Sequence, residues 1–344
     1  MTTTIRKIDT NNAAEVRQFQ TLLARSFFHL SFLWFLMPKP KDALIYLIDD
    51  IIVSGFSYKL YEALGKKIGF ANYFFTDPEH HGKGIGKELC KEGVKHLWDV
   101  ENCNMLITFV RDDNVGSWLN FVKNGFVRIP FLKLLPHVGF LSFLKIYAFS
   151  TFGICFGHDF YIAKKEEAVQ EESSSLGQIV LFALVNAVLF IPVFMTSRYI
   201  HLALAIFLSV FIGQVFFGFI GTLFTKRKWR FRFTDGGLIL LGVVSFGAGF
   251  MPMIGNWYPH EYENTPEFRR DMAIVSIASW LFLFAIGVVW PPTVGLVSIL
   301  LIYRCIFFIG DPLKSYGGQR VYDWSRGAFA LIMAISVLFV FRIF

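Results

Sequence analysis

The sequence predicts two parts of different fold class: an α+β domain over residues 1–165 and an all-α domain of about six apolar helices over residues 176–344. Three observations support this division. Patterns typical of strands and helices alternate in the first part, and long apolar stretches fill the second. Between them, residues 166–175 are charged and end in serines, which is typical of a linker.

The composition is that of a membrane protein. Of 344 residues, 54% are apolar, 18% are aromatic and 17% are charged, and the mean hydropathy is +0.50. Residues 1–175 hold 20 Lys and Arg against 19 Asp and Glu, whereas residues 176–344 hold 13 against 7. Because the positive balance belongs to the apolar part, membrane topology explains it better than nucleic-acid binding does. The four cysteines show no paired spacing, which predicts reduced thiols and no structural zinc.

In the first part, apolar alternation predicts strands and amphipathic spacing predicts helices. The expected strands are residues 4–8, 51–61, 68–76, 104–110 and 159–164. The expected helices are residues 11–27, 40–49, 87–98 and 114–124. Asn12 and Asn114 stand at predicted N-caps, and Gly125 stands where the last of these helices ends.

Two apolar stretches interrupt this pattern. Residues 27–37 are too short to span a bilayer, which takes about 20 residues, and too aromatic for a solvated loop. They predict a buried core helix or, as we prefer, a segment that lies in the headgroup region. Residues 131–157 predict two in-plane helices or a re-entrant hairpin that turns near residues 136–139. A single crossing is disfavoured there because it would separate the last strand from its sheet.

The chemistry is expected at a glycine-rich turn between the strand at 68–76 and the helix at 87–98. Its sequence is Asp77-Pro78-Glu79-His80-His81-Gly82-Lys83-Gly84-Ile85-Gly86-Lys87. Glycine adopts backbone conformations that a Cβ forbids and lets a ligand approach the main chain closely. Since the start of a helix also favours anions, the turn predicts a phosphate site.

The run from His81 to Gly86 resembles the pyrophosphate-binding signature of the GNAT superfamily of acyl-CoA-dependent N-acyltransferases, usually Gln/Arg-x-x-Gly-x-Gly. His81 departs from this signature, whereas Gly84 and Gly86 match it. A second stretch is similar to the family's other motif, in which an Asn opens a helix and a Gly-Phe closes it. Its matching residues are Asn114, Ser117, Phe121, Gly125 and Phe126.

This resemblance covers residues 1–165 and implies a mixed, mostly antiparallel sheet with flanking helices. It also implies a V-shaped opening beside the strand at 104–110, which receives acetyl-CoA or another acyl-CoA as co-substrate without a metal. The implied co-substrate contacts are His81, Gly82, Lys83, Gly84, Ile85, Gly86, Lys87, Asn114, Ser117 and Phe121.

In the implied reaction an amine attacks the thioester directly, and a strand N–H polarises the carbonyl. Many members use a Tyr of the second motif to protonate the departing thiolate, but Phe121 stands at that position and cannot donate a proton. Asp77, Glu79 and His80 are candidates for the base, because they follow the central strand. For His80 the alternatives are a polar surface residue and a contact to the phosphates.

The second part is expected to cross a membrane six times, or five times if the helix around Pro291 and Pro292 is one broken helix. The predicted spans are residues 176–196, 201–224, 237–257, 272–290, 293–309 and 327–344. Acyl-CoA is cytosolic, so the first domain is expected on that side. Residues 225–233, with five basic residues, are expected there too, and the acidic residues 259–271 on the opposite side. Arg304 lies inside a span and is expected either to face a polar partner or to reach an interface.

Together these features predict a multi-pass protein of the cytoplasmic membrane. Its expected activity is N-acyl transfer from acyl-CoA to an amine of a membrane-associated or lipid-like acceptor, with the lipid bilayer as partner and no nucleic acid. Two alternatives stay open: a non-catalytic acyl-CoA sensor that regulates a transporter or scaffold, and a membrane-anchored protein acetyltransferase. An intramembrane metalloprotease is disfavoured, because His260-Glu261 lacks the second His of the His-Glu-x-x-His motif.

Overall fold

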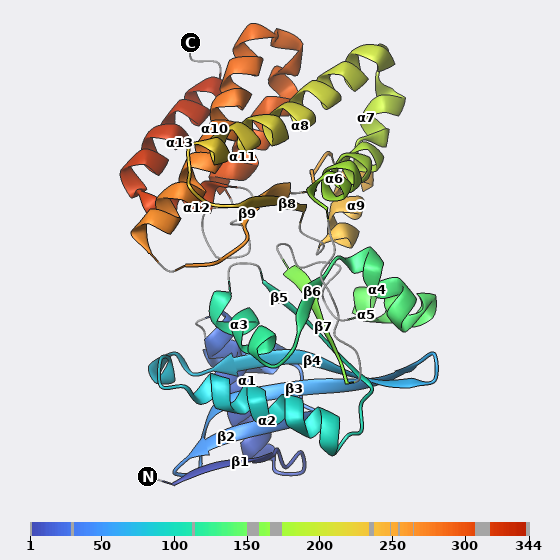
Figure 1. The fold of residues 1–344 in the computed structure, drawn as a ribbon, viewed down its shortest axis with the longest axis vertical. Helices are drawn as coiled ribbons and strands as arrows, with labels where there is room; N and C mark the ends of the chain where they lie inside the picture. Colours follow the sequence, from blue (N-terminus) through green and yellow to red (C-terminus); the bar gives the residue numbers. More distant parts are fainter. Residues whose placement is uncertain are drawn as a thin grey trace. The chain divides into compact units, whose positions relative to one another are not determined.

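The computed structural model describes residues 2–28, 31–111, 114–149, 158–165, 174–233, 237–247, 249–253, 255–263, 265–306 and 317–341. Contacts divide the chain into two compact units. The first consists of Met1–Ser150 and Asp159–Glu171, and the second of Thr151–His158 and Glu172–Phe344. Figure 1 shows the elements of both units. The predicted linker at 166–175 lies, except for its last two residues, outside the described residues.

The first unit is built on a seven-stranded sheet in the order β1-β2-β3-β4-β5-β7-β6. Its strands are β1 (Thr3–Lys7), β2 (Asp42–Ile48), β3 (Ile51–Ala63), β4 (Lys66–Thr76), β5 (Met105–Arg111), β6 (Val127–Ile129) and β7 (His158–Lys164). Strands β1 to β4 pair antiparallel in sequence order, as do β6 and β7, whereas β4 and β5 are parallel. The predicted α+β class with a mostly antiparallel sheet is therefore confirmed.

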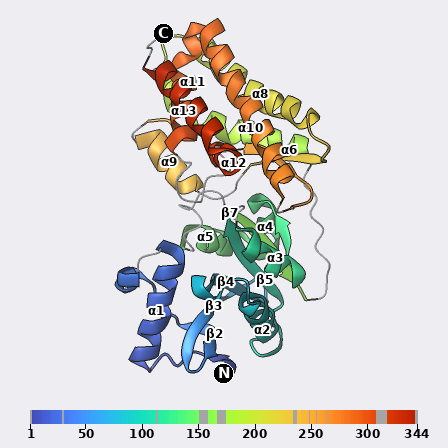
Figure 2. The ribbon, with the colours of Figure 1, turned by 90° about the vertical axis from the view of Figure 1, so that its left-hand side faces the viewer.

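Helices cover both faces of this sheet. Helix α1 (Ala13–Phe28) packs through Phe19 and Leu23 on one face. On the other face lie α2 (Ile85–Asp99), which contributes Leu89, and α3 (Val115–Lys123), which contributes Phe121. Figure 2 shows α1 and α2 on opposite sides of the sheet. The predicted N-cap of α1 is present, since Asn12 Oδ1 accepts hydrogen bonds from the backbone N–H groups of Ala14 and Glu15.

The predicted helix at residues 40–49 is wrong, because this stretch forms β2. Every residue of β2 after Asp42 is buried. Its side chains alternate between the two faces of the sheet: Ala43, Ile45 and Leu47 belong to the core under α1, and Leu44, Tyr46 and Ile48 to the core under α2. A strand that is buried on both faces is apolar throughout and lacks the alternation that distinguishes a strand from a helix.

The two apolar inserts form short helices at the surface of the first unit. The 3-10 helix η1 (Ser31–Leu36) has no buried residue, and Phe32, Phe35 and Leu36 are 61–65% exposed. A buried core helix is therefore wrong for residues 31–37 of this stretch. The second insert forms α4 (Phe131–Val138) and α5 (Phe140–Phe149), which separate at Gly139, inside the predicted turn region. Residues 29–30 and 150–157 of these inserts lie outside the described residues.

The second unit consists of helices and one small antiparallel sheet. Its helices are α6 (Ser175–Leu189), α7 (Ile191–Thr196), α8 (Ile200–Leu223), α9 (Leu238–Gly247), α10 (Pro266–Val289), α11 (Val294–Ile306), α12 (Gly318–Trp324) and α13 (Arg326–Val340). The sheet pairs β8 (Trp229–Phe233) with β9 (Gly255–Pro259). The 3-10 helix η3 (Pro291–Thr293) separates α10 from α11, so the two prolines mark a turn between two helices.

Two helices of the described chain, α8 and α10, are long and apolar enough to cross a membrane, with 24 residues each. The other four predicted spans correspond to the shorter apolar helices α6, α9, α11 and α13. The described residues thus give two candidate spans in place of the six that the sequence predicts. Two close contacts show the relative direction of the two long helices. Gly221 of α8 lies against Val275 of α10, and Gly213 of α8 lies against Phe282 of α10. The two helices are therefore antiparallel along most of their length.

The prediction that residues 225–233 and 259–271 lie on opposite sides of a membrane is wrong. Arg227, just after α8, binds Glu263 and Asp271 with N–O distances of 2.9 Å each. Strand β8 follows α8 and pairs with β9, which precedes α10. The segment between these strands starts and ends at the same place, so α9 turns back where the sequence predicts a crossing.

Arg304 is buried in the interior of the second unit. Its guanidinium donates hydrogen bonds to Ser279 Oγ (3.1 Å) and Gln214 Oε1 (3.2 Å) and lies over the ring of Trp280. Of the two predicted environments, the structure shows the polar partners and not the interface.

Candidate functional site

The glycine-rich turn joins the end of β4 to the start of α2. Asp77 Oδ1 accepts a hydrogen bond from the N–H of Glu79 (3.1 Å) and caps the 3-10 helix η2 (Pro78–His80). Gly82 and Gly84 follow with φ of +78° and +81°, the left-handed region that favours glycine. Gly84 is also the N-cap of α2 and supplies no side chain to bond the first N–H groups of the helix. Such an uncapped helix start suits an anion.

The turn is open at Gly82 and Gly84, because a Cβ at either position would have no heavy atom within 4 Å. Lys83 between them is exposed, as is Lys87 in the first turn of α2, whereas the side chain of Ile85 is buried in the core. Gly86 has a different role. A Cβ there would approach Thr76 Oγ1 to 3.0 Å, so Gly86 allows α2 to pack closely on β4.

Strands β4 and β5 separate near this turn. Their parallel ladder runs from the pair Ile68–Met105 only to the pair Ala71–Thr108, although both strands continue. At this last pair, Thr108 Oγ1 donates a hydrogen bond to the carbonyl oxygen of Ala71 (3.0 Å). Beyond it the two strands no longer pair with each other, which is the strand divergence that the resemblance implies.

A β-bulge in β4 lies directly beyond the last pair and was not predicted. Ser57 of β3 pairs with Tyr73 of β4, and the next residue, Tyr58, pairs with Ala71. Asn72 is therefore the extra residue of the bulge and has no opposite residue in β3. Its backbone N–H is a candidate donor to a carbonyl oxygen placed between the separating strands. The sequence around Asn72 gives no signal of this bulge, because it depends on the register of two strands.

Two of the three candidate bases are held in an ion-pair cluster. Arg25 of α1 binds Glu79 and lies 3.4 Å from Asp77 Oδ2. Asp77 also caps η2, so both carboxylates have structural partners. The Nδ1 atom of His80 is 3.9 Å from Asp77 Oδ2, which is too long for a hydrogen bond, and it has no hydrogen-bond partner among the described residues. The adjacent His81 bonds through Nε2 to the carbonyl oxygen of Thr76 (3.0 Å).

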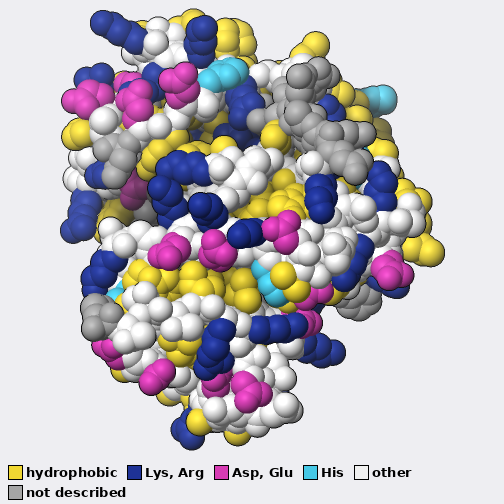
Figure 3. All heavy atoms as spheres, turned by 60° about the horizontal axis from the view of Figure 1, so that its bottom comes forward, with side chains coloured by type: hydrophobic (Ala, Val, Ile, Leu, Met, Phe, Trp, Pro, Cys, Tyr) yellow, Lys and Arg dark blue, Asp and Glu magenta, His cyan; other side chains and the backbone are white. Residues whose placement is uncertain are grey.

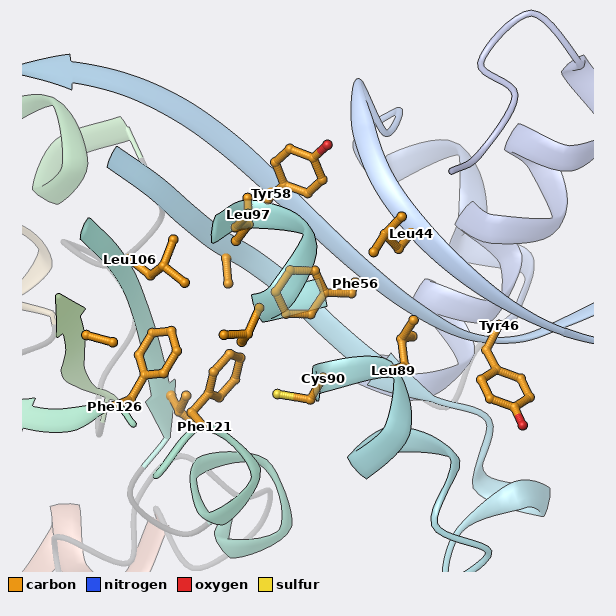
Figure 4. Packing of buried hydrophobic residues seen from close by; sticks show 14 of the residues in the cluster. Leu44, Tyr46, Phe56, Tyr58, Leu89, Cys90, Leu97, Leu106, Phe121 and Phe126 are labelled. Atoms are coloured by element: carbon orange, nitrogen blue, oxygen red, sulfur yellow. The ribbon is translucent and has the colours of Figure 1, made fainter. Parts of the chain in front are cut away.

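The second motif builds α3 and its packing. Asn114 Oδ1 accepts a hydrogen bond from the N–H of Ser117 (3.1 Å) and caps the helix. The side chain of Phe121 is only 1% exposed, and its ring contacts Phe74 and Phe126 at centroid distances of 5.7 and 5.1 Å. Figure 4 shows Phe121 and Phe126 side by side in this core. Phe121 is thus a core residue whose side chain is turned away from solvent.

Two further observations concern the titratable side chains. Burial raises the pKa of the Cys90 thiol to about 12, which makes Cys90 a packed thiol and not a nucleophile. In the part of the chain that the structure describes, no three His, Cys, Asp or Glu side chains gather as a metal site would require.

Comparisons with known proteins concern the first unit. Residues 10–126 match the model of the acetyltransferase (GNAT) family. The chain is also similar to the solved NatC complex bound to Gag peptide and CoA, with 13% identity over 48% of this chain and 99% of the other, and a TM-score of 0.35. It is similar to the ribosomal-protein-S18-alanine N-acetyltransferase of Escherichia coli, with 9% identity over 50% of this chain and 99% of the other, and a TM-score of 0.34. It is also similar to the PaiA N-acetyltransferase of Thermoplasma acidophilum in complex with coenzyme A, with 14% identity over 48% of this chain and 99% of the other, and a TM-score of 0.34.

No curated protein matches the chain. The assignment of residues 10–126 rests on the family match and not on these low structural scores. Residues 10–126 of the chain therefore form a GNAT acetyltransferase domain.

Proposed function

We propose that the protein is an acyl-CoA-dependent N-acyltransferase, most simply an N-acetyltransferase, that works at a membrane. The observation that carries this proposal is the open turn with Gly82 and Gly84 at the uncapped start of α2, close to the separation of β4 and β5. The family match over residues 10–126 supports the same activity.

In the proposed reaction the diphosphate of acyl-CoA rests on backbone N–H groups of the glycine-rich turn. The thioester lies between the separating strands, where the N–H of Asn72 polarises its carbonyl. The amine of the acceptor gives its proton to His80 and attacks the carbonyl carbon, so that a C–N bond forms and the C–S bond breaks. The CoA thiolate then takes a proton from water, because Phe121 has none to give.

The membrane part of the proposal is supported by the second unit and by the two inserts. Helices α8 and α10 are long and apolar enough to cross a bilayer. The exposed aromatic side chains of η1 are of the kind that lies in a headgroup region. We therefore propose a multi-pass protein with the first unit in the cytosol, where acyl-CoA is made, and an acceptor amine that is part of a lipid or is held at the bilayer.

Phe121 favours one alternative, an acyl-CoA sensor without turnover, because a phenyl ring stands where the family usually has a tyrosine that donates a proton. The two functions differ in one measurable property. Both predict acyl-CoA binding, but only the transferase releases CoA when an amine is supplied.

The test uses the full chain in lipid nanodiscs, with acetyl-CoA binding measured by calorimetry and CoA release measured with a thiol reagent. A long-chain alkylamine in the bilayer, a short-chain alkylamine in solution and a peptide with a free N-terminus serve as acceptors. Release with the long-chain amine alone is the expected result. Release with the peptide alone would indicate a protein acetyltransferase, and binding without release would indicate a sensor. Absence of acetyl-CoA binding would overturn the proposal.

A further inference from the structure

A small cavity lies in the first unit where the turn between β3 and β4 meets α4. It has a volume of about 100 Å³ and is lined by Leu64 of the turn, Lys66 at the start of β4, Asn104, Met105, Pro136 and His137 of α4, and Lys164 of β7. Two lysines and a histidine thus line the cavity, and none of its lining residues is acidic. This charge suits an anionic group.

The cavity is separate from the candidate acyl-CoA site. Lys66 begins β4, whereas the glycine-rich turn follows Thr76 at the other end of that strand. At about 3.3 Å per residue, the two places are roughly 30 Å apart along β4. An anion in this cavity is therefore not the diphosphate of the co-substrate.

Exposed apolar side chains adjoin the cavity. Leu64 is 66% exposed at the turn, and Phe140, Leu141 and Leu144 at the start of α5 are 43–74% exposed. Gly139, between α4 and α5, joins the two groups, since a Cβ there would approach Leu64 Cδ2 to 3.3 Å. We name the surface formed by Leu64, Phe140, Leu141 and Leu144, together with the cavity, the docking surface.

The charge of the α4–α5 insert has one sign. Residues 131–149 contain Lys133, His137 and Lys145 but no Asp or Glu. Projecting apolar side chains with a basic surround are typical of segments that lie on anionic bilayers. Figure 3 shows one face of the molecule, on which apolar patches border basic and acidic side chains alike, so the purely basic charge of the insert is a local property.

We propose that the docking surface seats the first unit on an anionic lipid bilayer. Phe140, Leu141 and Leu144 enter the headgroup region, and the phosphate of one lipid occupies the cavity beside Lys66. The inference rests on the membrane placement in the proposed function, but it does not require acyl transfer. Docking of this kind holds the catalytic domain where a lipid-borne amine is concentrated, which raises the rate of encounter with it.

The experiment compares hydrogen exchange of the full chain in nanodiscs of phosphatidylcholine alone and of phosphatidylcholine with phosphatidylglycerol. Backbone amides of residues 131–149 and of the turn around Leu64 are expected to exchange more slowly in the anionic nanodiscs. Lys66→Glu should abolish this difference, whereas Lys95→Glu, at an exposed position on α2, should preserve it. Leu141→Asp should also abolish the difference between the two nanodiscs. Its control is Val100→Asp, at a position that is 64% exposed, which should preserve the difference.

Urea unfolding is measured on every variant and reports whether the first unit is folded, and acetyl-CoA binding is measured separately. Equal exchange of wild type in the two nanodiscs would overturn the inference, as would an unchanged difference in Lys66→Glu. Slower exchange on adding soluble glycerol phosphate to the neutral nanodiscs would show that a free anion, not a lipid, fills the cavity. If acetyl-CoA does not bind but the lipid difference persists, the proposed function fails and the docking surface stands.

Discussion

Replacing Gly84 with Glu is expected to weaken acyl-CoA binding strongly while the first unit stays folded. Gly84 has φ of +81° and no atom within 4 Å of the position of a Cβ, so a new side chain would extend into the space that we assign to the diphosphate. Gly65 provides a matched control. It lies in the turn between β3 and β4, at the other end of β4, with φ of +71° and an equally open surrounding.

The two substitutions should lower the free energy of unfolding by similar amounts. A residue other than glycine in the left-handed region costs about 1–2 kcal/mol, and neither position adds a steric clash. Their effects on binding should differ. A carboxylate about 6 Å from one phosphate charge, at an effective dielectric constant of about 20, is repelled by roughly 3 kcal/mol. This repulsion corresponds to a roughly 100-fold increase in the Kd of acetyl-CoA.

The assay is calorimetric titration of the full chain with acetyl-CoA, accompanied by urea unfolding of the same samples. Gly84→Glu is expected to raise the Kd strongly, and Gly65→Glu to leave it within a few-fold of wild type. The Kd of Gly84→Glu should also fall as salt is added, since screening weakens the repulsion. Equal Kd values for Gly84→Glu and Gly65→Glu would refute the assignment of the diphosphate to this turn.

Three further predictions follow from the described contacts. Phe121→Tyr should lower the free energy of unfolding by about 1–3 kcal/mol, because it buries an unpaired hydroxyl. Faster CoA release by this variant in an enzymatic assay would contradict the core placement of the ring. The hydrogen bonds from Arg6 hold the pKa of Glu15 below its usual range, so the stability that they give is present above the ordinary glutamate pKa and is lost as the pH falls through the lowered value. Glu15→Gln should therefore unfold more easily than wild type at neutral pH in urea titrations, and the two curves should converge in acid; a constant difference at all pH values would contradict this. Cysteines introduced at Lys226 and Glu261 should react with a membrane-impermeant thiol reagent from the same side of a reconstituted bilayer, and labelling from opposite sides would refute the corrected topology.

The parts of the candidate site that lie close together in the sequence could be predicted from it. Gly82, Gly84 and the cap Asn114 act through backbone conformation and bonds to residues a few positions away, so local sequence specifies them. The structure places them as a turn and a helix start where the sequence expects both. The same locality explains why the break at Gly139 falls inside the predicted turn region.

The residues that sequence reasoning missed depend on long-range contacts. Arg25 binds Asp77 and Glu79, which are more than 50 positions away in the sequence. The bulge at Asn72 follows from the register of β3 against β4, which depends on how the side chains of both strands fit the two faces of the sheet. These contacts matter for the chemistry, because Arg25 forms ion pairs with two of the candidate bases, Asp77 and Glu79. His80 is the candidate base that remains.

Counting apolar stretches predicted six spans, whereas two helices of the described chain are long and apolar enough to cross a membrane, and the reason for this difference changes how the orientation is inferred. The count assumes that each stretch passes through the bilayer, whereas α9 lies between two strands that pair with each other. Ser175 at the start of α6 lies at this same end, since its hydroxyl accepts a hydrogen bond from the N–H of Phe231 in β8 (3.1 Å).

The basic residues of the second unit are consequently more one-sided than the sequence suggested. Residues 225–233 and 259–271 together hold seven Lys and Arg at one end, whereas residues 190–199, which connect α6 to α8 at the other end, hold only Arg198. Lys and Arg near the ends of membrane helices favour the cytosolic side, and acidic residues contribute little to this preference. Moving the acidic loop to the basic end therefore does not weaken the proposed orientation. It adds Arg269 and Arg270 to the end at which α6 begins, the end that the proposed orientation places in the cytosol.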